Sequence, residues 1–429
     1  MDSNLLNYQN QSRSVTSVTP LLIGVILYLC GGVLNYYVIL YSPVYINLSI
    51  VGLALCLSYG VFRILRVPTT PGDFRYTVWF ATLFLAWVLA SYLWSPSTEY
   101  GLYKTISLTS NLIIFFMVIF FARDRKFLAS LDNTLIPIGV VLGILYILFG
   151  NFYSPFAKLA SEYANDGGRF AKAIYLTTSQ LLSFIIVFSV VLNRKGRALK
   201  TIALVFMYLV ILISGARSAL IFTLMFHGLV MMARPGAIHF GIKQYFLIAT
   251  FIGSMIYAWV KFELDFNMID RVLERFGELF SFDDGGRLAF IQVIYDKSRV
   301  WYEMLFGHGI GGFGIARRGV DVRDYPHNLF FDLFYELGLV GVVVFTLFLM
   351  GIFKMCFKCF ETKRERVTAL VIGMLPLLEL MKSSTYAEYR IFWVSMAIMI
   401  IYSVSNKKKI GYPSYSNSMR FKALSASNT

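Results

Sequence analysis

The sequence predicts an all-α integral membrane protein with about twelve transmembrane helices. The chain has 429 residues, of which 57% are hydrophobic and only 15% are charged. A soluble domain carries roughly 25% charged residues, so this chain has too little polar surface for a water-soluble body. Apolar stretches of about 20 residues, enough to cross a bilayer, recur from Leu21 to Tyr402.

The apolar stretches are separated by mostly short connections. The predicted spans are residues 20–42, 44–62, 77–94, 105–122, 132–150, 175–193, 201–214, 218–233, 244–262, 326–352, 367–383 and 388–404. They divide the chain into an N-terminal tail (1–19), helices 1–9 (20–262), a long loop (263–325), helices 10–12 (326–404) and a C-terminal tail (405–429).

Basic residues cluster in alternate connections, which fixes the predicted orientation. The clusters are Arg63, Arg66 and Arg75; Arg123, Arg125 and Lys126; Arg194, Lys195, Arg197 and Lys200; Arg234 and Lys243; Lys354, Lys358, Lys363, Arg364 and Arg366; and Lys407, Lys408 and Lys409. Because such clusters stay in the cytoplasm, both termini are expected there, in a multi-pass protein whose long loop faces outward. Orientation signals also explain the net charge of +15, so no nucleic-acid partner is expected.

The long outward loop has helical patterns of its own. Apolar residues repeat at three and four positions over residues 269–280, which predicts an amphipathic helix at the membrane surface. After the turn Asp283-Asp284-Gly285-Gly286, a second helix is expected from Arg287 to Leu305.

Several basic residues lie on the outer side, against the orientation rule. They are Arg217, Arg287, Arg299, Arg317, Arg318, Arg323, Lys382 and Arg390. Guanidiniums match phosphate oxygens bidentately, so this group predicts an anionic, phosphate-bearing ligand. Arg217 is the one charged residue between Lys200 and Arg234, and it follows Ser214-Gly215-Ala216. We expect it at the tip of a helical hairpin, in a functional role or as a snorkelling arginine at a helix end.

His327 is the predicted catalytic residue. It lies in Tyr325-Pro326-His327-Asn328, which opens a span, and Asn328, Asp332 and Glu336 then form a polar stripe at every fourth position. Histidine suits a general base near neutral pH. Asp332 and Glu336 either support the site or hold arginines from other helices.

Other motifs point away from cofactors. Gly309-Ile310-Gly311-Gly312-Phe313-Gly314 matches GxGxxG, but no βαβ pattern surrounds it, so a turn that positions Arg317 and Arg318 is the better reading. Cys356 and Cys359 form a CxxC without a second pair. Neither a metal nor another cofactor is expected, and the outward loops contain no Asp-x-Asp pair.

Three patches resemble the O-antigen ligase and O-antigen polymerase superfamily. They are Ser214-Gly215-Ala216-Arg217-Ser218, Gly286-Arg287-Leu288, and His327-Asn328 followed nine residues later by Gly338-Leu339-Val340-Gly341. The stretch from Leu305 to Gly311 is similar to the segment that precedes the histidine in that family. The likeness covers roughly Thr201 to Leu349, and the first half of the chain matches only as a set of membrane helices.

The resemblance implies a GT-C-like, metal-independent, inverting glycosyltransferase in the bacterial inner membrane. Such an enzyme moves an oligosaccharide from undecaprenyl diphosphate to a sugar hydroxyl on the periplasmic face. By this resemblance Arg217 and Arg287 hold the diphosphate, with Arg317, Arg318, Arg323 and Arg390 as further candidates, and His327 activates the acceptor.

Three functions remain as alternatives: a polymerase, a ligase of the same superfamily, and a flippase. Glu336 before Leu337-Gly338 favours an O-antigen, capsular or exopolysaccharide polymerase, with a glycan acceptor and a chain-length regulator as partners. A ligase that uses lipid A–core as acceptor is the alternative. A lipid-linked glycan flippase is more distant, since it predicts an internal repeat that the sequence does not show.

Overall fold

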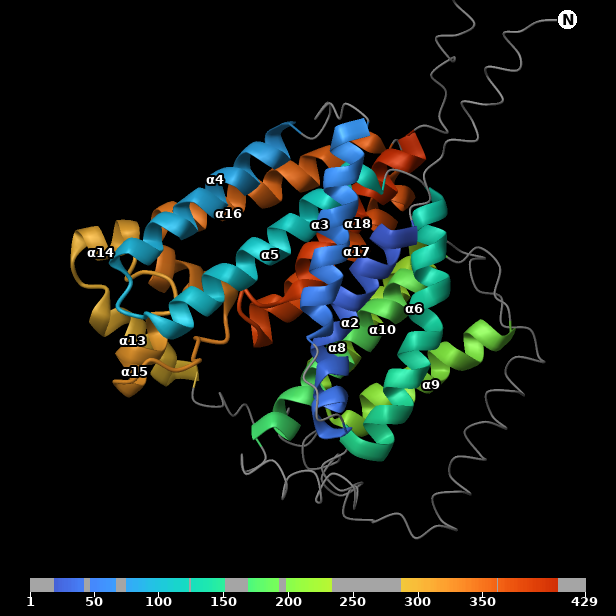
Figure 1. Ribbon diagram of the computed structural model, residues 1–429, viewed down its shortest axis with the longest axis horizontal. Coiled ribbons are helices and arrows are strands. Elements are labelled where there is room, and N and C mark those ends of the chain that lie inside the picture. The colour runs from blue at the N-terminus through green and yellow to red at the C-terminus, as the bar shows by residue number, and fades with distance from the viewer. Residues whose placement is uncertain are drawn as a thin grey trace, which may run out of the picture.

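The computed structural model describes residues 19–41, 47–66, 75–122, 125–150, 169–192, 198–233, 287–360 and 362–407. Every regular element among them is a helix, and they contain no strand (Figure 1). The helices are α2 Thr19–Tyr41, α3 Leu48–Arg66, α4 Arg75–Ser91, η2 Tyr92–Trp94, α5 Glu99–Phe121, α6 Arg125–Leu145, η3 Tyr146–Gly150, α8 Arg169–Leu192, α9 Ala198–Ser214, α10 Arg217–Ala233, α13 Arg287–Lys297, α14 Trp301–Phe306, α15 Phe313–Arg318, α16 Leu329–Cys359, α17 Lys363–Ser383 and α18 Arg390–Lys407.

The helices are those of a membrane-embedded protein. Five of them are long and apolar enough to cross a membrane, and they span Arg75–Trp94, Glu99–Phe121, Arg125–Phe149, Ile174–Leu192 and Leu329–Cys359. Five shorter apolar helices are Thr19–Asn35, Leu48–Ile64, Ala198–Ser214, Arg217–Ala233 and Arg390–Ser405. Each predicted span overlaps a helix except 244–262, which lies outside the described residues, and the total of about twelve crossings stays a prediction.

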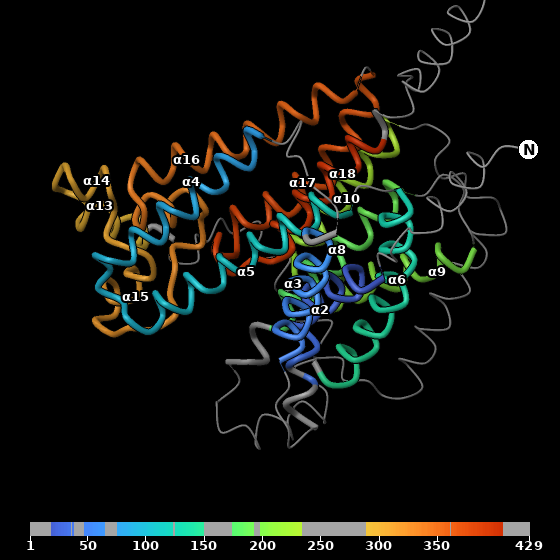
Figure 2. The backbone as a smooth tube through the Cα atoms, turned by 45° about the horizontal axis from the view of Figure 1, so that its top comes forward, coloured from blue at the N-terminus to red at the C-terminus, as the bar shows by residue number. Residues whose placement is uncertain are grey.

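Helix α18 is the centre of the bundle. It packs against α5, α16 and α17, and its residues from Ile391 to Ile401 are all buried. Trp393 is fully buried among the rings of Phe84, Phe345 and Phe392. Helices α4 and α16 lie side by side in Figures 1 and 2, and α13, α14 and α15 gather at one end of this pair.

The segment that leads into α16 differs from the predicted single helix 287–305. The structure has two helices, α13 and α14, with Val300 in an extended conformation (φ −93°, ψ 137°) as the N-cap of α14. The predicted amphipathic helix 269–280 lies outside the described residues. The GxGxxG stretch forms the expected turn, because Gly309 and Gly311 have φ of 88° and 82° and α15 follows with Arg317 and Arg318 in its last turn.

Helix α16 is broken at Gly338, which has φ 66° and ψ −171°. A broken helix at membrane depth leaves carbonyl groups that need other donors. The backbone N–H of His308 donates to Tyr335 O (2.8 Å), that of Gly309 to Glu336 O (2.9 Å), and the indole N–H of Trp87 to Leu337 O (3.0 Å). The turn at residues 307–312, which we call the glycine turn, therefore supplies donors for carbonyl groups that the break in α16 leaves without intrahelical partners.

Replacing Gly338 by alanine is expected to destabilise the fold by roughly 2–5 kcal/mol. The left-handed φ disfavours a side chain, and the new Cβ would lie 2.2 Å from Leu305 O. Gly228→Ala is the matched control, because a Cβ there meets nothing within 4 Å, and it should leave thermal stability in detergent unchanged or slightly raised. Equal melting temperatures for the two variants would contradict this account of the break.

Candidate functional site

His327 lies at the start of α16, held by the helix cap that follows it. The Asn328 side chain accepts hydrogen bonds from the backbone N–H groups of Phe330 (3.0 Å) and Phe331 (3.3 Å), so Asn328 is the N-cap. His327 has φ 54°, and among the described residues no other non-glycine residue has a positive φ. Such a conformation costs about 1–3 kcal/mol and is typical of functional sites.

Two aromatic rings enclose the partly buried imidazole. The His327 ring centroid lies 4.5 Å from that of Tyr325 and 5.6 Å from that of Phe290. The Arg317 guanidinium lies 4.3 Å from the Phe290 ring, and that of Arg323 lies 6.0 Å from the Tyr325 ring. These five residues, which we call the histidine cluster, place a histidine and two cations together.

The arginines of this region are held by two carboxylates. Asp324 Oδ2 accepts from Arg317 (2.9 Å) and Arg318 (2.7 Å), and Glu388 lies 2.7 Å from Arg323. Three guanidiniums therefore meet two carboxylates, and a positive charge remains beside the imidazole. The side chains of Arg318 and Arg323 are 52% and 57% exposed, so an anion can reach them.

Hydrogen bonds tie three connecting segments together around the cluster. Asp321 accepts from Ser97 Oγ (2.6 Å) and from the backbone N–H of Thr98 and Glu99 (both 2.9 Å). Partial burial alone would raise the pKa of Asp321, but these hydrogen bonds outweigh it and lower the pKa, so the carboxylate stays ionised at the start of α5. Glu388, between α17 and α18, accepts from Tyr100 (2.7 Å).

Beneath the cluster lies a charge network in which Lys104, Asp332 and Glu336 are completely buried. The Lys104 Nζ lies 3.0 Å from Asp332 Oδ1 and 2.8 Å from Glu336 Oε1. Glu336 also accepts from Tyr386 (2.8 Å) and from the backbone N–H of Gly311 (2.9 Å). The two acidic residues thus have a structural role in these contacts, and their partner is a lysine, whereas the structural alternative in the sequence analysis named arginines.

Arg217 begins α10 after a break at Gly215 and Ala216, so the expected interruption between two helices is present, while the outer tip of a hairpin stays a prediction. The next residue, Ser218, lies against Glu379 on α17. Four residues after Glu379, at the end of α17, the Ser383 carbonyl accepts a hydrogen bond from the Tyr325 hydroxyl (3.2 Å). Arg217 and the histidine cluster therefore lie at the same end of α17.

The other two predicted arginines are placed differently. Arg287 is the first residue of α13, three positions before Phe290, and its side chain lies outside the described residues. The Arg390 guanidinium lies over the Tyr28 ring (5.1 Å to the centroid) and donates to Ser49, so its described contacts hold α18 to α2 and α3. Its assignment to the substrate site stays a prediction.

Glu379 is a further candidate that the sequence reading missed. Its side chain is buried, Oε2 accepts from Gln180 (3.3 Å), and Oε1 has no hydrogen-bond partner among the described residues. Ser218 and the charge of Lys382 also lie close to this carboxylate, and the oxygen without a partner is available to a donor on a ligand. The signal was a lone acidic residue within the apolar span 367–383.

Within the described part of the chain, no three His, Cys, Asp or Glu side chains are grouped so that they could hold a metal ion. That the proposed transfer reaction needs no metal ion stays a prediction. Comparison of the chain with models of known protein families finds no match, and comparison with curated proteins finds none either.

Replacing Lys104 by methionine should destabilise the protein by about 3–5 kcal/mol, because it leaves two buried carboxylates without a cation. The triple variant Lys104→Met, Asp332→Asn, Glu336→Gln removes every charge of the network and should recover most of that stability. Thermal unfolding in detergent measures both. A single variant as stable as the wild type would show that the network is not what holds α5 to α16.

Proposed function

We propose that this protein is a membrane glycosyltransferase that moves a glycan from undecaprenyl diphosphate to a sugar hydroxyl, as a polymerase of O-antigen or a related polysaccharide. His327 carries the proposal. It is the residue with positive φ directly before the N-cap of α16, and it lies between two rings that each have a guanidinium over them. Two of the three sequence patches that resemble the superfamily coincide with distinctive described features, namely the interruption before Arg217 and the His327 cap with its helix break at Gly338.

In the proposed reaction, His327 is the general base. An imidazole nitrogen takes the proton of the acceptor hydroxyl while the oxygen attacks the anomeric carbon and inverts it. The bond from that carbon to the diphosphate oxygen breaks, and its electron pair leaves with the diphosphate. Guanidiniums stabilise the charge that develops on this group, as oriented cations do in other transfer reactions. Arg217, Arg317 and Arg323 are the described arginines that we assign to this task.

The tyrosine and phenylalanine rings give the imidazole a fixed orientation. The imidazole is partly buried between these rings, and in the proposed reaction the acceptor hydroxyl binds at its remaining open side. The carboxylates of Asp324 and Glu388 hold the arginines in place without neutralising all of them.

Substituting His327 should remove the base and leave the fold intact. His327→Ala and His327→Gln are each expected to lower the rate of transfer by roughly 10²- to 10⁴-fold, while the lipid-linked donor still binds. In a deletion strain that makes lipopolysaccharide, either variant should leave a single repeat unit on lipid A–core. A loss of only a few-fold would contradict general-base catalysis, and bare core with polymer left on undecaprenyl diphosphate would identify a ligase instead.

Substituting Arg217 should slow transfer, because the leaving group loses a stabilising cation. Arg217→Ala is expected to lower kcat by at least about tenfold, and Arg217→Lys to recover only part of it, because lysine lacks the bidentate fork. Arg299→Ala is the matched control, since Arg299 is 68% exposed and its described contacts are with Asp296 and the Tyr295 ring of its own segment. Transfer at the wild-type rate by Arg217→Ala would exclude Arg217 from the site.

A further inference from the structure

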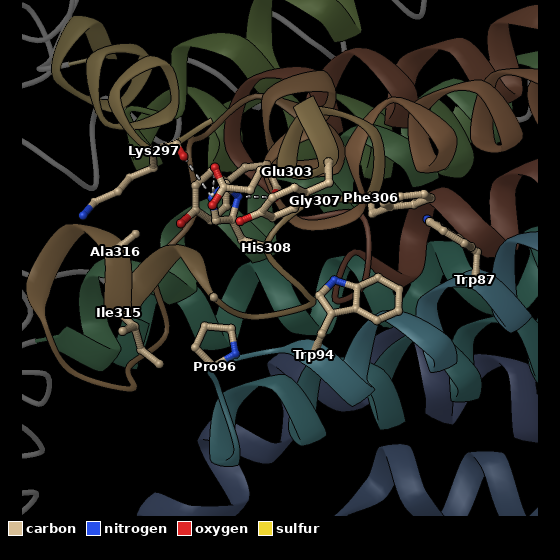
Figure 3. A pocket seen from close by; sticks show the side chains of 13 residues that line it. Trp87, Trp94, Pro96, Lys297, Glu303, Phe306, Gly307, His308, Ile315 and Ala316 are labelled. Atoms are coloured by element: carbon tan, nitrogen blue, oxygen red, sulfur yellow. Dashed lines mark hydrogen bonds and ion pairs between the residues drawn. The ribbon is translucent and has the colours of Figure 1, made fainter. Parts of the chain in front are cut away.

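A second feature of the same end of the molecule is a pocket of about 810 Å³ between α4, α13, α14, α15 and the start of α16 (Figure 3). The pocket does not include His327. Tyr335, on its wall, contacts Phe313 (5.3 Å between centroids), Phe313 contacts Phe290 (6.0 Å), and Phe290 contacts His327 (5.6 Å). Three ring contacts therefore separate the pocket from the proposed base.

One part of the pocket is aromatic. The centroid of the Trp87 ring lies 5.8 Å from that of Trp94 and 6.0 Å from that of Phe306. The indole N–H of Trp87 is bound to Leu337 O, which fixes this ring, while Trp94 is 41% exposed. Aromatic faces of this kind pack against the apolar C–H face of a sugar ring.

The other part of the pocket is polar: both ring nitrogens of His308 face carbonyl oxygens, of Tyr335 (3.3 Å) and Lys297 (3.2 Å), whereas the Glu303 carboxylate and the exposed Lys297 ammonium are open to a ligand. The closest described contact of the Glu303 carboxylate is His308 Nε2 at 3.8 Å, which is too long for a hydrogen bond. The Lys297 ammonium has no ion-pair partner in the part of the chain that the structure describes. The His308 ring is stacked on Tyr335 at 4.4 Å and 4°, so its position is fixed.

This combination selects among possible ligands. An alkyl chain would cover the Glu303 carboxylate, whose side chain is 24% exposed, without giving it a hydrogen-bond donor, and a polar group that loses water without gaining a partner costs free energy. A phosphate would pair with Lys297 but would also bring a second anion next to Glu303. A sugar ring presents hydroxyl groups that both donate and accept, together with an apolar face, and so matches both parts of the pocket.

We propose that the pocket between Trp94 and Glu303 binds a sugar ring of the glycan, away from the reacting bond. The inference rests on the proposed function, because it names a subsite of the same enzyme. The sugar belongs either to the acceptor glycan or to the lipid-linked donor. Either way, the pocket would recognise a unit several bonds from the anomeric carbon and so contribute to the choice of glycan.

The test uses the full-length protein in lipid nanodiscs and a lipid-free oligosaccharide probe. The probe is released by mild acid from the lipid-linked glycans of the cells that make the protein, and it carries a fluorophore at its reducing end. Fluorescence anisotropy should show binding that Trp94→Ala and Glu303→Gln each weaken by roughly tenfold. Trp301→Ala is the matched control, because this tryptophan is 67% exposed on the same helix as Glu303 and is not part of the pocket lining.

Two further results keep this inference separate from the proposed reaction. His327→Ala should bind the probe with the wild-type affinity. If the wild type and His327→Ala both bind the probe but the wild type transfers no glycan, the proposed reaction is excluded and the sugar subsite is retained. Binding at wild-type affinity by Trp94→Ala and Glu303→Gln, or displacement of the probe by sugar-free polyprenyl phosphate, would overturn the subsite. A rise in KM for the acceptor alone in Trp94→Ala assigns the sugar to the acceptor, and a rise for the donor alone assigns it to the donor.

Discussion

The buried network of Lys104, Asp332 and Glu336 is the constraint on which the candidate site depends. It joins α5 to α16 and, through Gly311 and Tyr386, also holds the glycine turn and the connection between α17 and α18. Charges at this depth are costly unless all of them are paired, so these segments cannot shift separately. His327 lies five residues before Asp332, and its position follows from the same pairing.

The break at Gly338 has a second consequence for the site. The carbonyls that it releases are bound by Trp87, His308 and Gly309, so the loop before His327 is fixed to the helix after it. The same contacts build the walls of the aromatic pocket, since Trp87 and His308 both line it. One helix break therefore connects the histidine cluster to the pocket where we place a sugar ring.

Local patterns in the sequence predicted the parts of the structure that depend on local physics. Apolar length located the long described helices, the Ser-Gly-Ala break located the turn before Arg217, and the Pro-His-Asn stretch located the start of α16. These local patterns could not predict which side chains on different helices pair with one another. Nothing in the spacing of Asp332 and Glu336 identifies Lys104, which is more than two hundred positions away, and nothing beside Arg390 indicates its contacts with α2 and α3.

The proposed function is transfer of a lipid-linked glycan, as distinct from its movement across the membrane. The most direct test uses the purified protein reconstituted in vesicles with radiolabelled undecaprenyl-diphosphate-linked glycan, an acceptor glycan and EDTA. The quantities measured are the undecaprenyl diphosphate released and the glycosidic bonds formed. We predict that undecaprenyl diphosphate is released in equal amount to the new glycosidic bonds. Intact donor that only changes leaflet, or release that requires an added divalent metal, would contradict the account.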